Sequence, residues 1–173
     1  AGTEGLEYAA SKGLGVVGME GLRGGTLGGE PPGEVQRIWD EADVKRTPAE
    51  WAFRWIWNRP EIQVNLSGMN DERHIEENIR VAGEAHPNSL TDKELDLVSR
   101  VAEAYRGLMQ SDCTGCRYCL PCPYGVAIPD CLQALNNKYA LRSRQGGLVY
   151  AVFVGGAMSG TYSGAKLCTE CGA

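Results

Sequence analysis

Four cysteines recur at a constant interval in the second half of the chain. Cys113, Cys116, Cys119 and Cys122 are separated from one another by two residues each, and Pro123 follows the last of them. A tight loop with this spacing turns successive thiols toward one point, and thiolates are strong ligands for soft metal centres. The spacing therefore predicts a small inorganic centre held by sulfur.

The spacing is typical of an iron–sulfur run. In the bacterial pattern, three cysteines with two-residue gaps precede a fourth that is followed by proline, and the fourth often serves the other cluster of a pair. Here the last gap is two residues instead of three. We interpret Cys113, Cys116 and Cys119 as ligands of one [4Fe–4S] centre, and Cys122 as reaching a second centre.

A further pair, Cys168 and Cys171, lies close to the end of the sequence. It has the form of the start of a second run, whose other cysteines are not among these 173 residues. If the ligands are shared between two clusters, we expect both centres to be incomplete in this chain. Cys131 falls outside the spacing, and we interpret it as a buried structural thiol.

Two other uses of the thiols are possible. The two outer pairs, Cys113 with Cys116 and Cys168 with Cys171, could hold a structural tetrahedral zinc ion, which would leave two cysteines of the run unused. A disulfide framework needs an oxidising compartment, and the N-terminus shows no secretory pattern. We therefore expect reduced thiols and a cytoplasmic location.

Composition narrows the class of protein. A length of 173 residues suits one ordinary domain or two small ones, and 43% hydrophobic with 23% charged residues is typical of a soluble globular protein. The net charge of −5 and the lack of a basic run argue against nucleic-acid binding. The longest apolar stretch, residues 146–158, is too short to span a membrane.

Hydrophobic patterning predicts helices and strands in alternation. A helix at 5–12 precedes a continuously apolar strand at 13–19, and a glycine-rich loop covers 21–33. Ile62, Val64 and Leu66 alternate as a second strand. The glycines at 13, 15 and 18 match a dinucleotide-binding pattern, but they lie inside the strand instead of after it, so we assign them no binding role.

Three further helices are marked by their starts. Residues 47–50 and 91–94 are capping boxes, and residues 67–70 end the second strand and cap a helix between them. Another helix is predicted from 129 to about 141. The side chains that we expect to face inward are Trp51 and Trp55 in the first helix and Ile75, Ile79 and Ala82 in the second.

This order of elements is typical of a parallel α/β fold. Two parallel strands neither bury both faces of a sheet nor close a barrel, so we expect residues 1–109 to be a piece of a larger α/β domain. Residues 110–173 hold the cysteines and form a second domain.

Several segments together resemble the C-terminal part of an aldo-keto reductase of the subgroup that carries a ferredoxin-like iron–sulfur extension. The resemblance implies the last two strands and helices of a TIM (β/α)8 barrel, followed by a small, mostly α-helical ferredoxin-like [4Fe–4S] domain that is truncated at its C-terminus. The segments that carry it are residues 12–25, 47–55, 66–70, 75–78 and 113–129.

The resemblance also implies half of a nicotinamide cofactor site, for NADP or NAD. Met19 and Gly21 depart from the residues usual in the family, and Glu77 and Asn78 could instead cap or solvate a helix. The family's catalytic Asp, Tyr, Lys and His come from earlier strands, so we expect no catalytic residue here. The residues that would contact the cofactor are Met19, Glu20, Leu22, Gly68, Met69, Asn70, Arg73, Glu77 and Asn78.

Three functions are compatible with these features of the sequence. The leading hypothesis is part of an iron–sulfur aldo-keto reductase-like oxidoreductase that acts with an unknown redox partner or a small carbonyl substrate. The second is a ferredoxin-like electron carrier or interaction module without its own catalysis. The third is a zinc-stabilised structural module. His74 and His86, the two histidines, are expected at the surface and not in acid–base catalysis.

Overall fold

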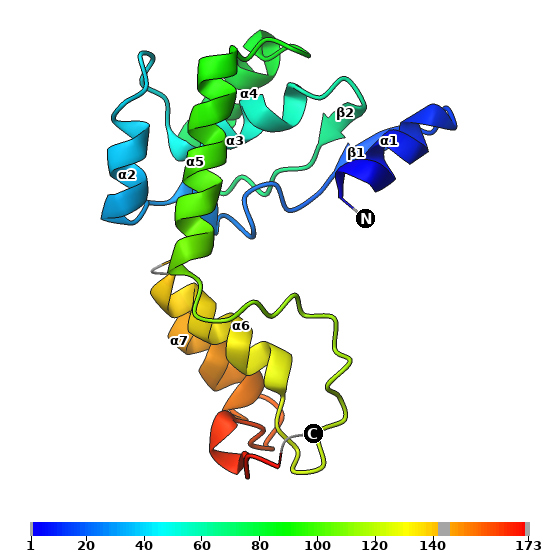
Figure 1. Cartoon of the computed structure of the whole chain (residues 1–173), viewed down its shortest axis with the longest axis vertical. Coiled ribbons are helices and arrows are strands. Elements are labelled where there is room, and N and C mark those ends of the chain that lie inside the picture. The colour runs from blue at the N-terminus through cyan, green and yellow to red at the C-terminus, as the bar shows by residue number, and fades with distance from the viewer. Residues whose placement is uncertain (1, 142–145, 172–173) are drawn as a thin grey trace. The chain divides into compact units, whose positions relative to one another are not determined.

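The computed structural model describes residues 2–141 and 146–171 (Figure 1). The chain is rich in helix and contains a two-stranded parallel sheet. It divides into two compact units, Ala1–Ala102 and Glu103–Ala173. None of the helices in the described ranges has the length and apolar character needed to cross a membrane.

The first unit alternates helices with its two strands. Its elements are α1 (Thr3–Ser11), β1 (Val16–Gly18), the 3-10 turn η1 (Thr26–Gly28), α2 (Gly33–Trp39), α3 (Pro48–Trp57), β2 (Ile62–Asn65), α4 (Glu72–Glu84) and α5 (Asp92–Leu108), which continues into the second unit. The helix α2 lies just after the glycine-rich loop and was not predicted from the sequence.

The two predicted strands are confirmed, and they pair in parallel. Val16 lies opposite Ile62 and Val17 opposite Val64, with an irregularity between Val16 and Val17. One side of the sheet meets α3, because Ile62 of β2 packs against the core that contains Phe53 and Ile56. The side chains of Val17 and Val64 are about half exposed, at 54% and 48%. The sheet therefore has one covered face and one bare apolar face.

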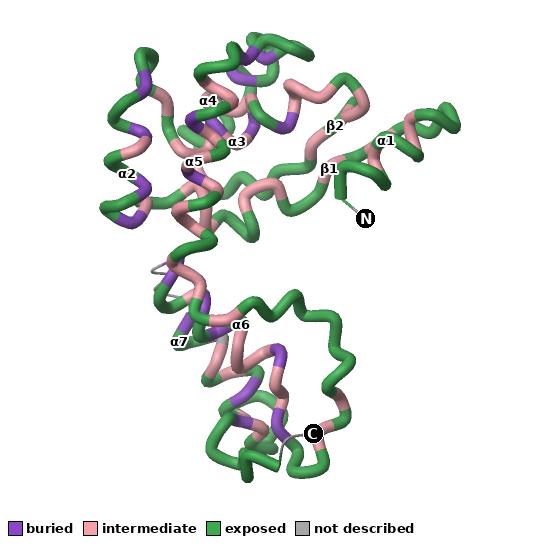
Figure 2. The backbone as a smooth tube through the Cα atoms, viewed as in Figure 1, coloured by how far each residue is buried: buried purple, intermediate pink, exposed green. Residues whose placement is uncertain are grey.

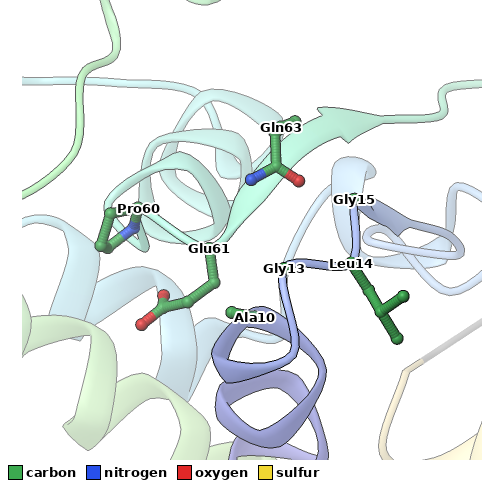
Figure 3. A pocket seen from close by; sticks show the side chains of 7 residues that line it. All are labelled: Ala10, Gly13, Leu14, Gly15, Pro60, Glu61 and Gln63. Carbon is green, nitrogen blue, oxygen red and sulfur yellow. The ribbon is translucent and has the colours of Figure 1, made fainter.

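A cavity of about 360 Å³ lies at the amino-terminal ends of both strands (Figure 3). Leu14 and Gly15 line it just before β1, and Pro60 and Glu61 line it just before β2. The carboxyl ends of the strands, where parallel α/β folds place their ligands, are at the opposite edge of the sheet.

The core of the first unit forms between α3 and α4. Phe53 and Ile56 of α3 pack with Val81 of α4 and with Ala85 immediately after it. Figure 2 shows buried residues in both helices. Trp51 is 2% exposed and stacks on Trp39 of α2, with ring centroids 5.0 Å apart. The prediction of a buried Trp55 was wrong, because this side chain is 41% exposed and lies near Arg59.

Both predicted helix starts are confirmed, but the capping box is complete only at α5, because the Glu50 side chain at α3 bonds to Arg54 and Arg80. Thr47 Oγ1 accepts a hydrogen bond from Glu50 N at 3.0 Å. Thr91 and Glu94 bond reciprocally, each side chain accepting from the other residue's backbone N–H. The cap of α4 differs from the prediction of residues 67–70. The N-cap is Asp71, whose side chain accepts a hydrogen bond from Arg73 N at 2.9 Å.

The inward face of α4 was also predicted wrongly. Ile75 and Ile79 are 41% and 67% exposed, whereas Val81 is fully buried. Polar contacts explain this rotation, because Glu77 accepts from Thr47 Oγ1 and Arg80 donates to Glu50 at 2.7 Å. These contacts turn that side of α4 toward α3 and bring Val81 into the core.

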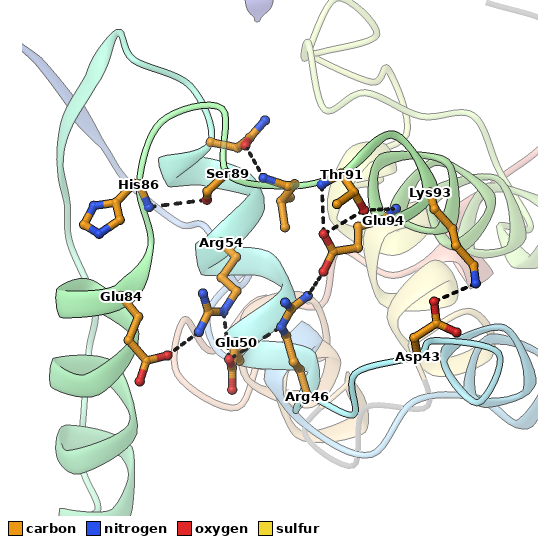
Figure 4. Close-up of polar contacts among 12 residues, drawn as sticks. Asp43, Arg46, Glu50, Arg54, Glu84, His86, Ser89, Thr91, Lys93 and Glu94 are labelled. Carbon is orange, nitrogen blue, oxygen red and sulfur yellow. Dashed lines mark hydrogen bonds and ion pairs between the residues drawn. The ribbon is translucent and has the colours of Figure 1, made fainter.

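Glu50 is the centre of an ion-pair network within the first unit (Figure 4). Its side chain is 8% exposed and accepts from Arg54 and Arg80, both at 2.7 Å. Burial by itself raises the pKa of Glu50, but the hydrogen bonds from Arg80 and Arg54 outweigh it and hold the pKa below its usual value. Arg46 extends the network to Glu94 on α5.

The second unit is built around α6 (Ile128–Tyr139), in agreement with the predicted helix at 129–141. A short helix, α7 (Gly146–Val149), leads into a π-helical turn, Tyr150–Val154, and a 3-10 turn, η3, spans Ala165–Leu167. The buried hydrophobic side chains in the described part of this unit are Val126, Ala134, Ala140, Leu141 and Val154.

Candidate functional site

The cysteine run occupies a long segment between α5 and α6. Residues 109–127 form neither helix nor strand, and Cys113, Cys116 and Cys119 are exposed, while Cys122 is half-buried. Cys168 and Cys171, in the other predicted ligand segment, are exposed as well. All six sulfurs belong to free thiols, as does Cys131. The candidate ligands are thus accessible from solvent.

The run is attached to the first turn of α6 by an ion pair. Arg117, which lies between the second and third cysteines, donates to Asp130 Oδ1 at 3.2 Å. The side chains are 61% and 32% exposed, so the contact contributes little energy, on the order of 1 kcal/mol or less. It nevertheless places the middle of the run beside the amino end of α6.

The segment before Cys168 reaches the same end of α6. Ala127, immediately before the helix, donates its N–H to Ser163 O at 2.8 Å. The Sγ atom of Cys131 lies 4.0 Å from the same carbonyl oxygen. Four residues lie between Cys122 and Ala127, and four lie between Ser163 and Cys168. Cys122 and Cys168 are therefore each only a short length of chain away from the amino end of α6.

The first and last Cys-x-x-Cys loops, at 113–116 and 168–171, both have a positive φ at their third residue. Gly115 and Glu170, each the third residue of its loop, have φ values of +73° and +54°. This left-handed conformation is strained for glutamate, so the residues around Glu170 must hold the loop in it. In the second loop the turn brings Glu170 N to 3.4 Å from Cys168 Sγ, as a donor to sulfur.

The thiols are not gathered on a single point. Within residues 2–141 and 146–171, no three side chains of His, Cys, Asp or Glu lie close enough to hold a metal ion together. The candidate donors are all sulfur, four in the run at 113–122 and two at Cys168 and Cys171, which fits iron–sulfur clusters or zinc. Cys131 differs from the others, because burial raises the pKa of its thiol and disfavours the thiolate that a metal requires.

No family model, curated protein or solved structure matches the chain.

The predicted nicotinamide half-site lies where two loops follow the parallel strands. Met19 and Glu20 follow β1, and Gly68 and Met69 follow β2, so the parallel pairing places both loops at the same edge of the sheet. Met19 is 71% exposed and Met69 41% exposed. Leu22, by contrast, packs against the core of α3 and α4.

Three polar residues of this half-site, Arg73, Glu77 and Asn78, already have side-chain partners within the protein. Arg73 donates to Asp71 at 2.7 Å, and this pair lowers the pKa of the Asp71 carboxyl. Glu77 accepts from Thr47, and Asn78 Nδ2 donates to Ser67 Oγ at 3.1 Å. Those contacts give Glu77 and Asn78 a structural role in joining α4 to neighbouring segments. Asn70 and Gly68 are exposed.

Sequence reasoning missed the residues of α6 that fix the cysteine run. Asp130 and Asn136 both contact the segment of residues 110–117. Asparagine is a weak helix former, so its place inside the predicted helix was the one sequence signal at Asn136, whereas its burial is evident only in the structure. His74 and His86 are both exposed, as expected.

Proposed function

We propose that residues 103–173 form an iron–sulfur domain that binds one or two [4Fe–4S] clusters through the cysteines of the run at 113–122 and of the pair Cys168 and Cys171. The observation that carries the proposal is the attachment of two thiol segments, 46 positions apart between Cys122 and Cys168, to the same end of α6. The ligands that we assign are Cys113, Cys116, Cys119, Cys122, Cys168 and Cys171. Such a centre supplies single-electron transfer.

Local electrostatics favour an anionic centre at this place. A thiolate-ligated cluster is negatively charged, and the amino end of a helix carries partial positive charge from its free N–H groups. The N–H of Glu170 already donates to Cys168 Sγ. Hydrogen bonds to sulfur are one of the factors that set the potential of a cluster.

We also propose that the first unit is the last part of a TIM barrel. The bare face of the sheet, with Val17 and Val64 exposed, supports this proposal, because parallel strands are normally covered on both faces. In such a barrel the loops after β1 and β2 contribute to a nicotinamide site for NADP or NAD. The complete protein is then an iron–sulfur aldo-keto reductase-like oxidoreductase, with a small carbonyl substrate or a redox partner.

The decisive experiment measures iron and acid-labile sulfide per chain, with a visible spectrum, after anaerobic purification. About four irons with matching sulfide are expected for one [4Fe–4S] centre. Cys116→Ser should lose most of the iron. Cys131→Ser is the matched control, since this half-buried thiol lies outside both loops, and it should retain the iron.

Two results would contradict the iron–sulfur assignment. Zinc without sulfide would identify the structural module instead. Full iron content in Cys116→Ser would remove this residue from the ligand set. An intact cluster without any affinity for nicotinamide cofactors would favour the ferredoxin-like carrier or interaction module.

The nicotinamide proposal is tested by titrating the chain with NADPH and NADH while following cofactor fluorescence. Arg73→Ala should weaken NADPH binding, because Arg73 is the cation of the half-site and its side chain is 85% exposed. Lys93→Ala removes another exposed cation, paired with Asp43, and should leave binding unchanged. Equal binding by both variants and the wild type would contradict a role for Arg73.

A further inference from the structure

Asn136 is a buried polar side chain in the interior of the second unit. It is 8% exposed and lies on α6. Its Oδ1 accepts from Gln110 N at 2.9 Å and from Ser111 N at 3.1 Å, and its Nδ2 donates to Ser111 O at 2.8 Å. These three bonds hold a backbone segment that has no secondary structure of its own. Asparagine is a poor helix former, so the contacts explain why it is found here.

The contact continues from Ser111 to the first predicted ligand. Cys113 donates its backbone N–H to Ser111 Oγ at 3.2 Å. Ser111 is therefore held through its backbone by Asn136 and holds Cys113 through its side chain. The start of the cysteine run is tied in this way to the interior of the unit.

A second attachment fixes the run farther along. Arg117 pairs with Asp130, six residues before Asn136 on the same helix. Six residues correspond to roughly 9 Å along a helix axis. Two parts of the run, Cys113 and the residues between Cys116 and Cys119, are thus attached to α6 at two separate points.

We propose that Asn136 is a positioning residue for the metal-binding run. It fixes the backbone from which Cys113 projects, so less chain freedom is lost when the thiols close around a centre. Asn136 itself does not contact the metal. This inference rests on the proposed iron–sulfur function, and it assigns to α6 the task of preorganising the ligands.

The test compares four variants with the wild-type chain, all reconstituted anaerobically with iron and sulfide. Asn136→Asp keeps the shape and an acceptor oxygen but replaces the donor to Ser111 O. Asn136→Ala removes all three bonds, and Ser111→Ala removes only the bond to Cys113 N–H. Asn137→Ala is the matched control, because this neighbouring asparagine has no side-chain hydrogen bond to a described residue. The readouts are the rate of iron release to a chelator and the EPR spectrum and midpoint potential of the reduced cluster.

The rate of iron release should rise most in the two Asn136 variants, less in Ser111→Ala and least in Asn137→Ala. Asn136→Ala is expected to release iron at least about tenfold faster than wild type, because the backbone N–H groups of Gln110 and Ser111 lose their acceptor. Asn136→Asp should accelerate release by roughly tenfold and Ser111→Ala by about threefold, with altered EPR spectra or potentials. Asn137→Ala should stay within about twofold of wild type. A residue that only stabilised the fold would lower thermal stability without changing the spectrum or potential of the bound cluster.

Contrary outcomes separate the two proposals. Release rates, spectra and potentials of Asn136→Asp and Ser111→Ala equal to wild type would overturn the positioning role and leave the iron–sulfur function intact. If Asn136→Ala fails to fold and loses its helical circular dichroism signal, Asn136→Asp and Ser111→Ala still test the positioning role. A wild-type chain that takes up neither iron nor sulfide would overturn the iron–sulfur function, and the positioning role with it.

Discussion

The two units of this chain are stabilised by different kinds of interaction. In the first unit the bulkiest fully buried side chains include Trp51, Phe53 and Val81, and a charged network surrounds Glu50. In the described part of the second unit, Val154 is the one large side chain buried to the same degree. Its long cysteine segment is held by hydrogen bonds from Asn136 and by one exposed ion pair.

This difference indicates what each unit needs in order to fold. Apolar burial contributes about 25 cal/mol per Å², so a unit with large buried aromatic side chains can gain most of its stability by itself. A small unit with few buried side chains commonly requires a metal or another crosslink. All four tryptophans, at positions 39, 51, 55 and 57, lie in the first unit, so their fluorescence follows its unfolding separately.

The largest expected effect is that of metal removal. If the second unit depends on its cluster, chelation under anaerobic conditions should abolish protection of residues 110–141 from hydrogen exchange, since metal binding in such domains contributes on the order of 10 kcal/mol to folding. Protection in α3 and α4 should be unchanged. Hydrogen exchange followed by mass spectrometry gives both results together. Unchanged protection of α6 in the metal-free chain would show that the second unit does not depend on metal for its folding.

Trp51→Ala should produce the largest effect of a substitution on the first unit. Removing this buried, stacked side chain is expected to lower the free energy of unfolding by about 3–5 kcal/mol, as measured by fluorescence of the remaining tryptophans in urea. Trp55→Ala, one turn away and 41% exposed, should cost about 1 kcal/mol or less. Iron content should be equal in both variants. Loss of iron in Trp51→Ala would contradict independent stabilisation of the units.

Glu50→Gln tests the ion-pair network and should cost about 2 kcal/mol. Arg54 and Arg80 both lose their buried partner, and both can still pair with the half-exposed Glu84. The low pKa of Glu50 in the folded state means that its contribution is present above the unfolded pKa and is lost as the pH falls below about 4.5.

This pH dependence is measured by urea unfolding between pH 3 and pH 7, detected by tryptophan fluorescence. The wild type should lose stability as the pH falls, and Glu50→Gln should lose less over the same interval. Identical pH profiles for the two proteins would mean that Glu50 is not the group responsible. Glu94 is a further candidate, because hydrogen bonds from Thr91 and Arg46 outweigh burial and lower its pKa as well.

Asp130→Asn should have the smallest effect of these changes. The pair of Asp130 with Arg117 is exposed to solvent, so its loss should cost about 0–1 kcal/mol and change the rate of iron release by roughly twofold. The chelator assay and a salt series measure this change, which should disappear at high ionic strength. A change as large as that of Asn136→Ala would show that the exposed contact positions the run more strongly than the buried one.

Local patterns in the sequence predicted the elements with a short-range cause. The N-cap bonds at Thr47 and Thr91 join residues three positions apart, and both helices begin where predicted. The two strands were evident from their apolar character, and their parallel pairing followed from the helices between them. The cysteine spacing likewise named the candidate ligands without reference to the fold.

Features that depend on distant residues were not predicted. The rotation of α4 that buries Val81 and exposes Ile79 is set by contacts of Glu77 and Arg80 with α3, and apolar periodicity alone favoured the wrong face. The glycine-rich loop concealed the start of α2, because its helical pattern is only seven residues long.

The sequence by itself determined which residues can hold a metal, since ligand chemistry depends on residue type and on spacing within one loop. Only the tertiary structure decided how the two thiol segments are brought to the same end of α6 and which residues hold them there. Asn136, Asp130 and Ser163 act across 13 to 36 positions of chain, on Ser111, Arg117 and Ala127. No local pattern encodes such contacts, because they exist only once packing has placed separate segments within hydrogen-bonding distance.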